Sequence, residues 1–138
     1  MNDTTIQLAT LDPEGDWFQP LRQELGVTSF GINKITLEPK KRLRVHLHES
    51  QEEVYVVLSG ELTVIVEGEA HVLGEGDLVR VAPKLRRQLT NPSSGRTVVL
   101  ALGGAGEHES RDARAWTSWD EEGEGRSPQE VPLPDDLP

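Results

Sequence analysis

The chain has 138 residues, no cysteine and a formal net charge of −10 at pH 7. This length suffices for one domain with a single hydrophobic core, and the lack of cysteine excludes disulfides and thiolate metal ligands. The negative charge argues against non-specific nucleic-acid binding, which depends on neutralising phosphates, and no stretch is apolar enough to span a membrane. Because no secretory signal is readable at the N-terminus, we expect a cytoplasmic protein.

The first 26 residues are expected to form an arm followed by one short amphipathic helix. Trp17, Phe18, Leu21 and Leu25 fall at helical spacing, and Gly26 is placed to end the helix. We therefore expect a helical lead before the main fold.

The middle of the chain, residues 27–104, has the pattern of many short strands separated by turn residues. We expect strands at 28–37, 43–48, 54–58, 62–66, 70–73, 78–81, 87–89 and 97–102. The breaks between them are rich in Gly, Pro, Asn and Asp, which favour turns. Short strands at such close and regular spacing predict an all-β sandwich or barrel.

The last segment, residues 105–138, is an acidic extension rich in Gly and Pro. It contains ten acidic and three basic residues. This composition predicts an irregular extension without a fold of its own. Trp116 and Trp119 interrupt it, and we expect these indoles to dock either on this domain or on a neighbouring subunit.

Two basic clusters, Lys40–Arg44 and Lys84–Arg87, break the acidic composition. Such clusters are usually a solvated rim. Alternatively, some of their arginines line a pocket mouth and hold an anionic ligand.

Two histidines and a glutamate form the clearest candidate site. His46 and His48 are two residues apart, so on a strand their side chains project from the same face. A break at residues 49–51 would let a second strand run back beside the first and present Glu53 to the pair. Two imidazoles and a carboxylate that converge on one point can bind Fe, Mn, Ni, Cu or Zn.

These residues also carry a family resemblance. The pattern His46-x-His48-x4-Glu53-x6-Gly60 resembles the first motif of the cupin superfamily, and residues 76–91 resemble the second, with its Gly-Asp turn, strand and final asparagine. The resemblance covers about residues 30–103. It implies a double-stranded β-helix, or jelly-roll, barrel. It does not imply one reaction, since this superfamily includes dioxygenases, isomerases, decarboxylases and pure binders.

By this resemblance, His46, His48 and Glu53 fall on three of the family's metal-ligand positions. The fourth position, normally a histidine of the second motif, holds Arg87. A guanidinium stays protonated and has no lone pair to offer, so it cannot bind a cation. The glycines that the family has at positions 40 and 84 are lysines here.

Arg87 leaves two interpretations open. In the first, two histidines and one carboxylate form a three-ligand site with open positions, and Arg87 binds a substrate carboxylate or phosphate beside the metal. In the second, metal binding is lost and Glu53 pairs with Arg87 inside the barrel. The four side chains would then form a polar pocket for an organic ligand.

Two further residues are candidates for substrate binding. Tyr55 shares the Glu53 face of its strand and could donate its phenol to a ligand, with core packing as the alternative. Arg44 shares the His46/His48 face and could lie at the barrel mouth, with a surface position as the alternative.

Three functions remain open from the sequence, and no catalytic residue is identified. The first is a divalent-metal protein, such as an oxygenase or isomerase, that acts on a small acidic metabolite. The second is a metal-free ligand-binding or sensing barrel, and the third is a non-catalytic protein whose acidic extension engages a partner. We also expect a homodimer, with the Trp17/Phe18 region or the Trp116/Trp119 region at its interface.

Overall fold

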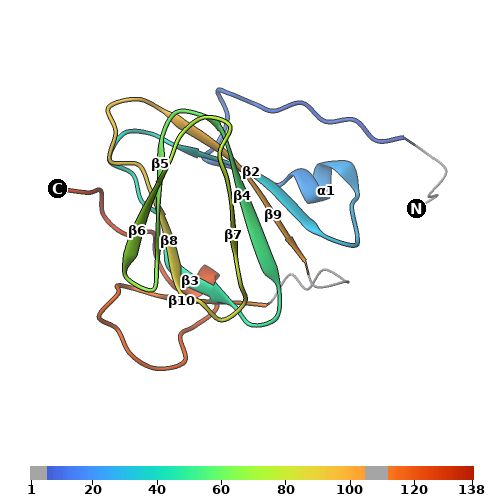
Figure 1. The fold of residues 1–138 in the computed structure, drawn as a ribbon. Coiled ribbons are helices and arrows are strands. Elements are labelled where there is room, and N and C mark those ends of the chain that lie inside the picture. The colour runs from blue at the N-terminus through green and yellow to red at the C-terminus, as the bar shows by residue number, and fades with distance from the viewer. Residues whose placement is uncertain (1–5, 105–111) are drawn as a thin grey trace.

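The fold consists of two five-stranded antiparallel sheets that face each other, as seen in a computed structural model that describes residues 6–104 and 112–138 (Figure 1). The strands are β1 (Phe18–Gln19), β2 (Gly31–Leu37), β3 (Val45–His48), β4 (Glu52–Ser59), β5 (Leu62–Val66), β6 (Glu69–Leu73), β7 (Leu78–Val81), β8 (Arg87–Thr90), β9 (Thr97–Gly104) and β10 (Ala113–Trp116). This confirms the predicted all-β jelly roll, although hydrogen bonds do not close the two sheets into one continuous barrel.

Sheet A has the strand order β1-β2-β9-β4-β7, and sheet B has the order β10-β3-β8-β5-β6. Strands that follow one another in the chain often lie in opposite sheets: β3 belongs to sheet B and β4 to sheet A. The turn at residues 49–51 therefore passes from one sheet to the other, and this crossing brings Glu53 opposite the β3 histidines.

The hydrophobic core lies between the two sheets. Successive side chains of a strand point to opposite faces, so every second residue of each strand points inward. The buried core cluster comprises Ile35, Leu37, Tyr55, Val57, Leu62, Val64, Val81, Leu89, Val99 and Ala101. Glu53 lies on the same face of β4 as the buried Tyr55 and Val57. Its side chain therefore points inward, between the two sheets.

The N-terminal helix is present but shorter than its apolar pattern suggests. Helix α1 spans Leu21–Leu25, and Gly26 ends it in the left-handed conformation (φ 73°), as predicted. Phe18 lies instead in β1, where it pairs with Ile35 of β2. No helix in the described part of the chain is long and apolar enough to cross a membrane.

The C-terminal extension is largely irregular, as predicted, and where the structure describes it, at residues 112–138, it packs against the domain. Strand β10 pairs with β3 and extends sheet B, and the 3-10 helix η1 (Pro128–Glu130) follows. Trp116 is 3% exposed. The Trp119 indole donates a hydrogen bond to Gln88 Oε1 (2.8 Å), so both tryptophans dock on their own domain.

The two basic clusters hold this segment in place, so neither is simply a solvated rim. Three residues of the first cluster contact the end of the chain: Lys41 Nζ lies 2.9 Å from Asp136 Oδ1, Arg42 Nε 2.8 Å from Asp135 O, and Arg44 Nε 2.5 Å from Val131 O. In the second cluster, the Arg86 guanidinium lies 3.7 Å above the Trp116 ring. That the acidic extension also engages a partner stays a prediction.

Candidate metal site

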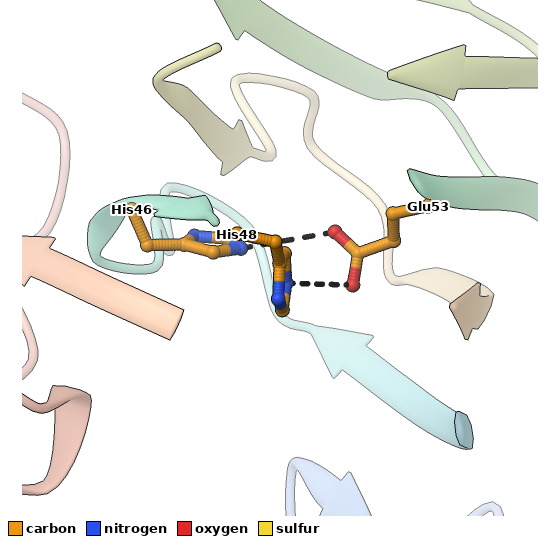
Figure 2. Close-up of side chains that lie close together, drawn as sticks. All are labelled: His46, His48 and Glu53. Carbon is orange, nitrogen blue, oxygen red and sulfur yellow. Dashed lines mark ion pairs between the residues drawn. The ribbon is translucent and has the colours of Figure 1, made fainter. Parts of the chain in front are cut away.

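The two histidines and the glutamate converge on one point, as Figure 2 shows. His46 and His48 project from the same face of β3, and their rings meet edge to face with centroids 5.4 Å apart. Glu53 reaches them from β4: its Oε2 lies 3.2 Å from His48 Nε2, and its Oε1 lies 3.8 Å from His46 Nε2. One ligand atom from each of the three residues lies within 4.8 Å of the others, so the predicted convergence is confirmed.

A backbone contact fixes how the His46 ring presents itself to the site. Its Nδ1 lies 3.2 Å from the carbonyl oxygen of Arg44. Because a carbonyl oxygen only accepts hydrogen bonds, Nδ1 carries the proton, and the neutral ring then has its lone pair on Nε2. Nε2 lies on the Glu53 side of the ring, and in the neutral ring its lone pair is available to a cation placed between the two residues.

Asp112 holds the turn that follows the second histidine, and it was not identified from the sequence. This 6%-exposed carboxylate accepts hydrogen bonds from the backbone N–H groups of Ser50 and Gln51 and from the Ser50 hydroxyl. Its Oδ2 also lies 3.8 Å from His48 Nδ1, on the far side of the ring from Glu53. Burial would raise the pKa of Asp112, but these hydrogen bonds outweigh it and lower the pKa.

A tyrosine and an arginine contact Glu53 from the interior side. The Tyr55 hydroxyl donates a hydrogen bond to Glu53 Oε1, and Arg87 Nη1 lies 3.9 Å from the same oxygen. Arg87 is fully buried on β8, directly opposite His46 in the strand register. The alignment of the second cupin motif is therefore right, since residue 87 does face the histidine pair.

Arg87 donates fewer hydrogen bonds than its guanidinium allows. Its Nη2 donates to the carbonyl oxygen of Ala82 (2.9 Å), whereas its buried Nε and Nη1 have no hydrogen-bond partner among the described residues. A buried guanidinium is costly unless a negative charge lies close by. Glu53 supplies that charge at 3.9 Å, in a loose ion pair.

The charges around Glu53 keep it ionised. Burial alone would raise its pKa, but the contacts with His46 and His48, and the positive charge that these rings carry when protonated, hold the pKa of Glu53 well below its usual range. Burial, followed by the nearby Glu53 charge, raises the pKa of Tyr55 well above its usual range. Tyr55 therefore stays a neutral donor to a carboxylate that stays charged.

A pocket of about 280 Å³ opens beside the site. His48 and Glu53 form part of its wall, and the remaining polar wall is one arginine and four amide side chains: Arg22, Gln23, Asn33, Gln51 and Gln129. Arg22 extends from α1, so the short helix contributes the pocket's cationic side chain. It was not among the residues we predicted from sequence.

The predicted substrate-binding residues lie elsewhere. None of Arg44, Tyr55 and Arg87 lines this pocket. Tyr55 is 1% exposed and bonded to Glu53, and Arg87 is sealed in the interior. Arg44 donates to the C-terminal segment at Val131. The structure therefore brings Tyr55 and Arg87 to the back of Glu53 and directs Arg44 away from the site.

The two lysines that replace family glycines have glycine-like backbones. Lys40 has φ 71° and Lys84 has φ 69°, in the left-handed region that side chains with a β-carbon disfavour. Lys84 also donates its backbone N–H to the carbonyl oxygen of His48 (2.7 Å). The turns of the family pattern are thus present although their glycines are not.

Comparisons with known proteins agree with this architecture. Among solved structures, a cupin protein from Bacteroides fragilis is 25% identical, with a TM-score of 0.68 and coverage of 80% of this chain and 92% of that one. A sugar phosphate isomerase of the cupin superfamily from Silicibacter pomeroyi is 26% identical (TM-score 0.60), over 72% of this chain and 63% of that one. The chain thus matches less than two thirds of that isomerase.

A third similar structure is the cupin domain of an XRE-family transcriptional regulator from Enterobacter cloacae. It is 28% identical, with a TM-score of 0.58, and covers 63% of this chain and 93% of that one. No curated protein has a matching sequence. The family pattern of the cupin domain matches residues 33–103, which is about half of the chain, and the chain therefore belongs to the cupin family.

Proposed function

We propose that this cupin binds a divalent transition metal through His46, His48 and Glu53 and uses it on a small anionic ligand in the adjoining pocket. The observation that carries the proposal is the convergence of three ligand atoms within 4.8 Å beside a pocket of about 280 Å³. Two imidazoles and one carboxylate suit Fe, Mn, Ni, Cu or Zn.

The donor atoms fit a cation. His46 presents the lone pair of Nε2 because its Nδ1 donates to the Arg44 carbonyl. Asp112 Oδ2 lies 3.8 Å from His48 Nδ1, too far for a hydrogen bond, but its negative charge favours a proton on that nitrogen and leaves Nε2 free for a cation. Glu53 is ionised. A bound metal would supply Lewis-acid or redox chemistry, which an isomerase or an oxygenase requires.

The pocket wall indicates the kind of ligand. Arg22 can pair with a carboxylate or phosphate, and the amides of Gln23, Asn33 and Gln129 can both donate and accept hydrogen bonds. A small anion that carries hydroxyl or carbonyl groups matches this wall. The isomerase from Silicibacter pomeroyi is named for such a substrate class, sugar phosphates, and this class is the first to test.

In this proposal Arg87 tunes the site and does not bind the substrate. Its guanidinium is fully buried behind Glu53 and lies outside the pocket wall. A positive charge a few ångströms from a divalent cation opposes metal binding by an amount on the order of several kcal/mol at intermediate dielectric. We therefore expect a weaker site than one with four neutral or anionic ligands.

Elemental analysis tests the proposal directly. The full chain, without a histidine tag and purified without chelator, is expected to contain Fe, Mn, Ni, Cu or Zn at near-stoichiometric amounts or to take it up on supplementation. The His46→Ala/His48→Ala variant is the matched control and should take up none. His71→Ala is a second control, because that histidine is exposed on β6, outside the cluster. Equal metal content in all three proteins would contradict the site.

A metal-free ligand-binding or sensing barrel is the second candidate function. The contact between Arg87 and Glu53 favours it, since Arg87 can neutralise the carboxylate without a metal. The similar domain from Enterobacter cloacae belongs to a transcriptional regulator, which fits a sensing role. If supplementation yields no metal, a thermal-shift screen of small hydroxylated anions, with Arg22→Gln as the control, tests this candidate.

A further inference from the structure

The C-terminal segment, residues 112–138, lies outside the part of the chain that matches the cupin pattern, and yet it holds the strand that carries both histidines. Its strand β10 pairs with all four residues of β3, with Ala113 opposite His48 and Ala115 opposite His46 (Figure 1). On the other side of β3, among the described residues, the pairing with β8 is in register only at His46. Most of the ladder that holds β3 in its sheet therefore comes from this segment.

The same segment fixes the turn that leads from the histidines to the third ligand. The Asp112 carboxylate accepts hydrogen bonds from the backbone N–H groups of Ser50 and Gln51. Its backbone carbonyl oxygen accepts one more from the N–H of Glu49 (3.0 Å). Because this turn joins β3 to β4, its conformation determines how Glu53 is placed opposite the histidines.

A single residue connects the segment to the His46 ring. The backbone carbonyl of Arg44 accepts a hydrogen bond from His46 Nδ1, and its guanidinium donates to the carbonyl oxygen of Val131. Val131 is 1% exposed and lies two residues after Gln129, which forms part of the pocket wall. The segment thus contacts the site in three ways: through the ladder of β3, through the turn and through the pocket wall.

Other contacts hold the segment on the domain away from the site. The Trp119 indole donates to the side chain of Gln88, and the backbone N–H of Leu137 donates to the carbonyl oxygen of Lys40 (2.7 Å). None of these residues is a candidate metal ligand. The docking of the segment can therefore be weakened without a change in any ligand side chain.

Two roles for the segment predict different behaviour. If the segment only covers sheet B, then looser packing lowers the stability and leaves the metal affinity of the folded chain unchanged. If it positions β3 and the turn, then a folded chain with a loosened segment binds metal less tightly. Because coupling between two binding events is reciprocal, a bound metal in that case also favours the docked segment.

We propose that the C-terminal segment is a positioning element of the metal site: docking of the segment on β3 and binding of a divalent metal by His46, His48 and Glu53 favour each other. This inference rests on the proposed function, since it needs a metal at these three residues. It assigns to the segment a role that the cupin pattern, which ends at residue 103, does not include.

Hydrogen exchange of the full chain, with and without Zn²⁺, tests the coupling. The peptide that covers Ala113–Trp116 is expected to exchange about fivefold more slowly, or slower still, when Zn²⁺ is in large excess over its dissociation constant. The matched control is the His46→Ala/His48→Ala variant, in which Zn²⁺ should leave this peptide unchanged. Because the parent chain carries no substitution, its result does not depend on whether a variant folds.

A pair of valine variants tests the coupling in the other direction. Val131→Ala removes two methyl groups from the docked segment, and Val99→Ala removes the same groups from the core between the sheets, where Val99 is 0% exposed. Both variants are expected to be less stable in urea. Only Val131→Ala is expected to weaken Zn²⁺ binding, by about fivefold or more in isothermal titration.

The outcomes separate this inference from the proposed function. If Zn²⁺ binds at His46 and His48 but leaves the exchange of β10 unchanged, the coupling is overturned and the metal site stands. Equal Zn²⁺ affinities of Val131→Ala and the parent would overturn the coupling in the same way. A parent that binds none of Fe, Mn, Ni, Cu and Zn at these histidines would instead contradict the metal site itself, and the coupling with it.

Discussion

The two cupin motifs of this chain match the family pattern to different extents. The first motif, residues 46–60, has both its turn and its three ligand residues. The second, residues 76–91, has its turn and its strand, but the side chain that faces the site is Arg87. The difference shows that the structural and the chemical roles of a motif are separable. Turns and strands depend on backbone conformation at several positions, whereas a metal ligand depends on a single side chain.

The two motifs meet at the Glu53 carboxylate. The histidines of the first motif approach it from β3, and Arg87 of the second approaches it from β8. Glu53 can thus interact with two positive charges: a metal ion bound with His46 and His48, and the guanidinium of Arg87. Four sets of variants can break or sharpen this comparison, and they follow in order of expected effect.

The largest effect is expected at Gly60, in the first motif. Gly60 has φ 82°, and a β-carbon there would lie 2.3 Å from the carbonyl oxygen of Arg96. Gly76, the first residue of the second motif, has φ 86° with nothing within 4 Å of such a carbon. Gly60→Ala should therefore lower the free energy of unfolding by about 3 kcal/mol or more, against about 1–2 kcal/mol for Gly76→Ala. Urea denaturation of both variants measures the difference, and equal losses would contradict the close approach at Gly60.

Replacement of the resident cation should have the next largest effect. Arg87→His removes a positive charge and offers an imidazole at the family's fourth ligand position. We expect the metal dissociation constant to fall about a hundredfold, which corresponds to about 2.7 kcal/mol. Isothermal titration with a divalent transition metal measures it.

A matched variant separates charge from ligation. Arg87→Gln removes the charge but adds no imidazole, so it should tighten metal binding less than Arg87→His does. If the two variants bind equally well, then the gain comes from the lost charge alone and the new imidazole does not reach the metal.

Asp112→Asn tests what holds the turn of the first motif. The carboxylate binds the backbone at Ser50 and Gln51, and an amide replaces those charge-assisted hydrogen bonds only in part. We expect a loss of about 1–2 kcal/mol of unfolding free energy at neutral pH. Asp136→Asn, in an exposed pair with Lys41, is the control and should change little.

The effect of Asp112 on stability should depend on pH. Its pKa is lower in the folded state than the usual value of about 3.9, so the unfolded chain binds the proton more readily. The stabilisation is therefore complete above about pH 5, well above the unfolded pKa, and is lost as the pH falls through the lower, folded pKa. Urea unfolding of the parent and Asp112→Asn should show a gap that narrows in acid. A gap that is the same at neutral and acidic pH would mean that Asp112 acts through packing rather than charge.

The sequence predicted those parts of the molecule that depend on local patterns. Short runs of strand-forming residues between turn-forming breaks identified the strands, and the spacing of His46, His48 and Glu53 identified the candidate metal site. The Gly-Asp turn of the second motif placed Arg87 correctly against the histidines. These features need only the residues within one or two strands.

Features that depend on contacts between distant segments were missed. Asp112 lies more than sixty residues from the turn that it supports, as the separation of 62 from Ser50 illustrates, and nothing near it in the sequence suggests that role. Arg22 lies at the pocket because β1 pairs with β2, so that the helix α1 that follows β1 also packs beside β2. The acidic composition of the C-terminal segment suggested an irregular tail. It could not show that Lys41, Arg42 and Arg86 on the domain contact this segment.

The smallest effect is expected at the two lysines with left-handed backbones. Lys84→Gly relieves a strain of about 1 kcal/mol but gives the unfolded chain more freedom, so we expect a net gain in unfolding free energy of less than about 1 kcal/mol. Lys40→Gly should gain less, because Lys40 Nζ lies 3.5 Å from the Pro92 carbonyl oxygen and that contact is lost. Lys84→Ala is the control: it removes the charge and keeps the β-carbon, so it should bring no gain. Urea denaturation ranks the three variants. If Lys84→Gly is no more stable than Lys84→Ala, then the turn of the second motif holds its lysine without strain, and the glycine of the family pattern has no structural advantage in this chain.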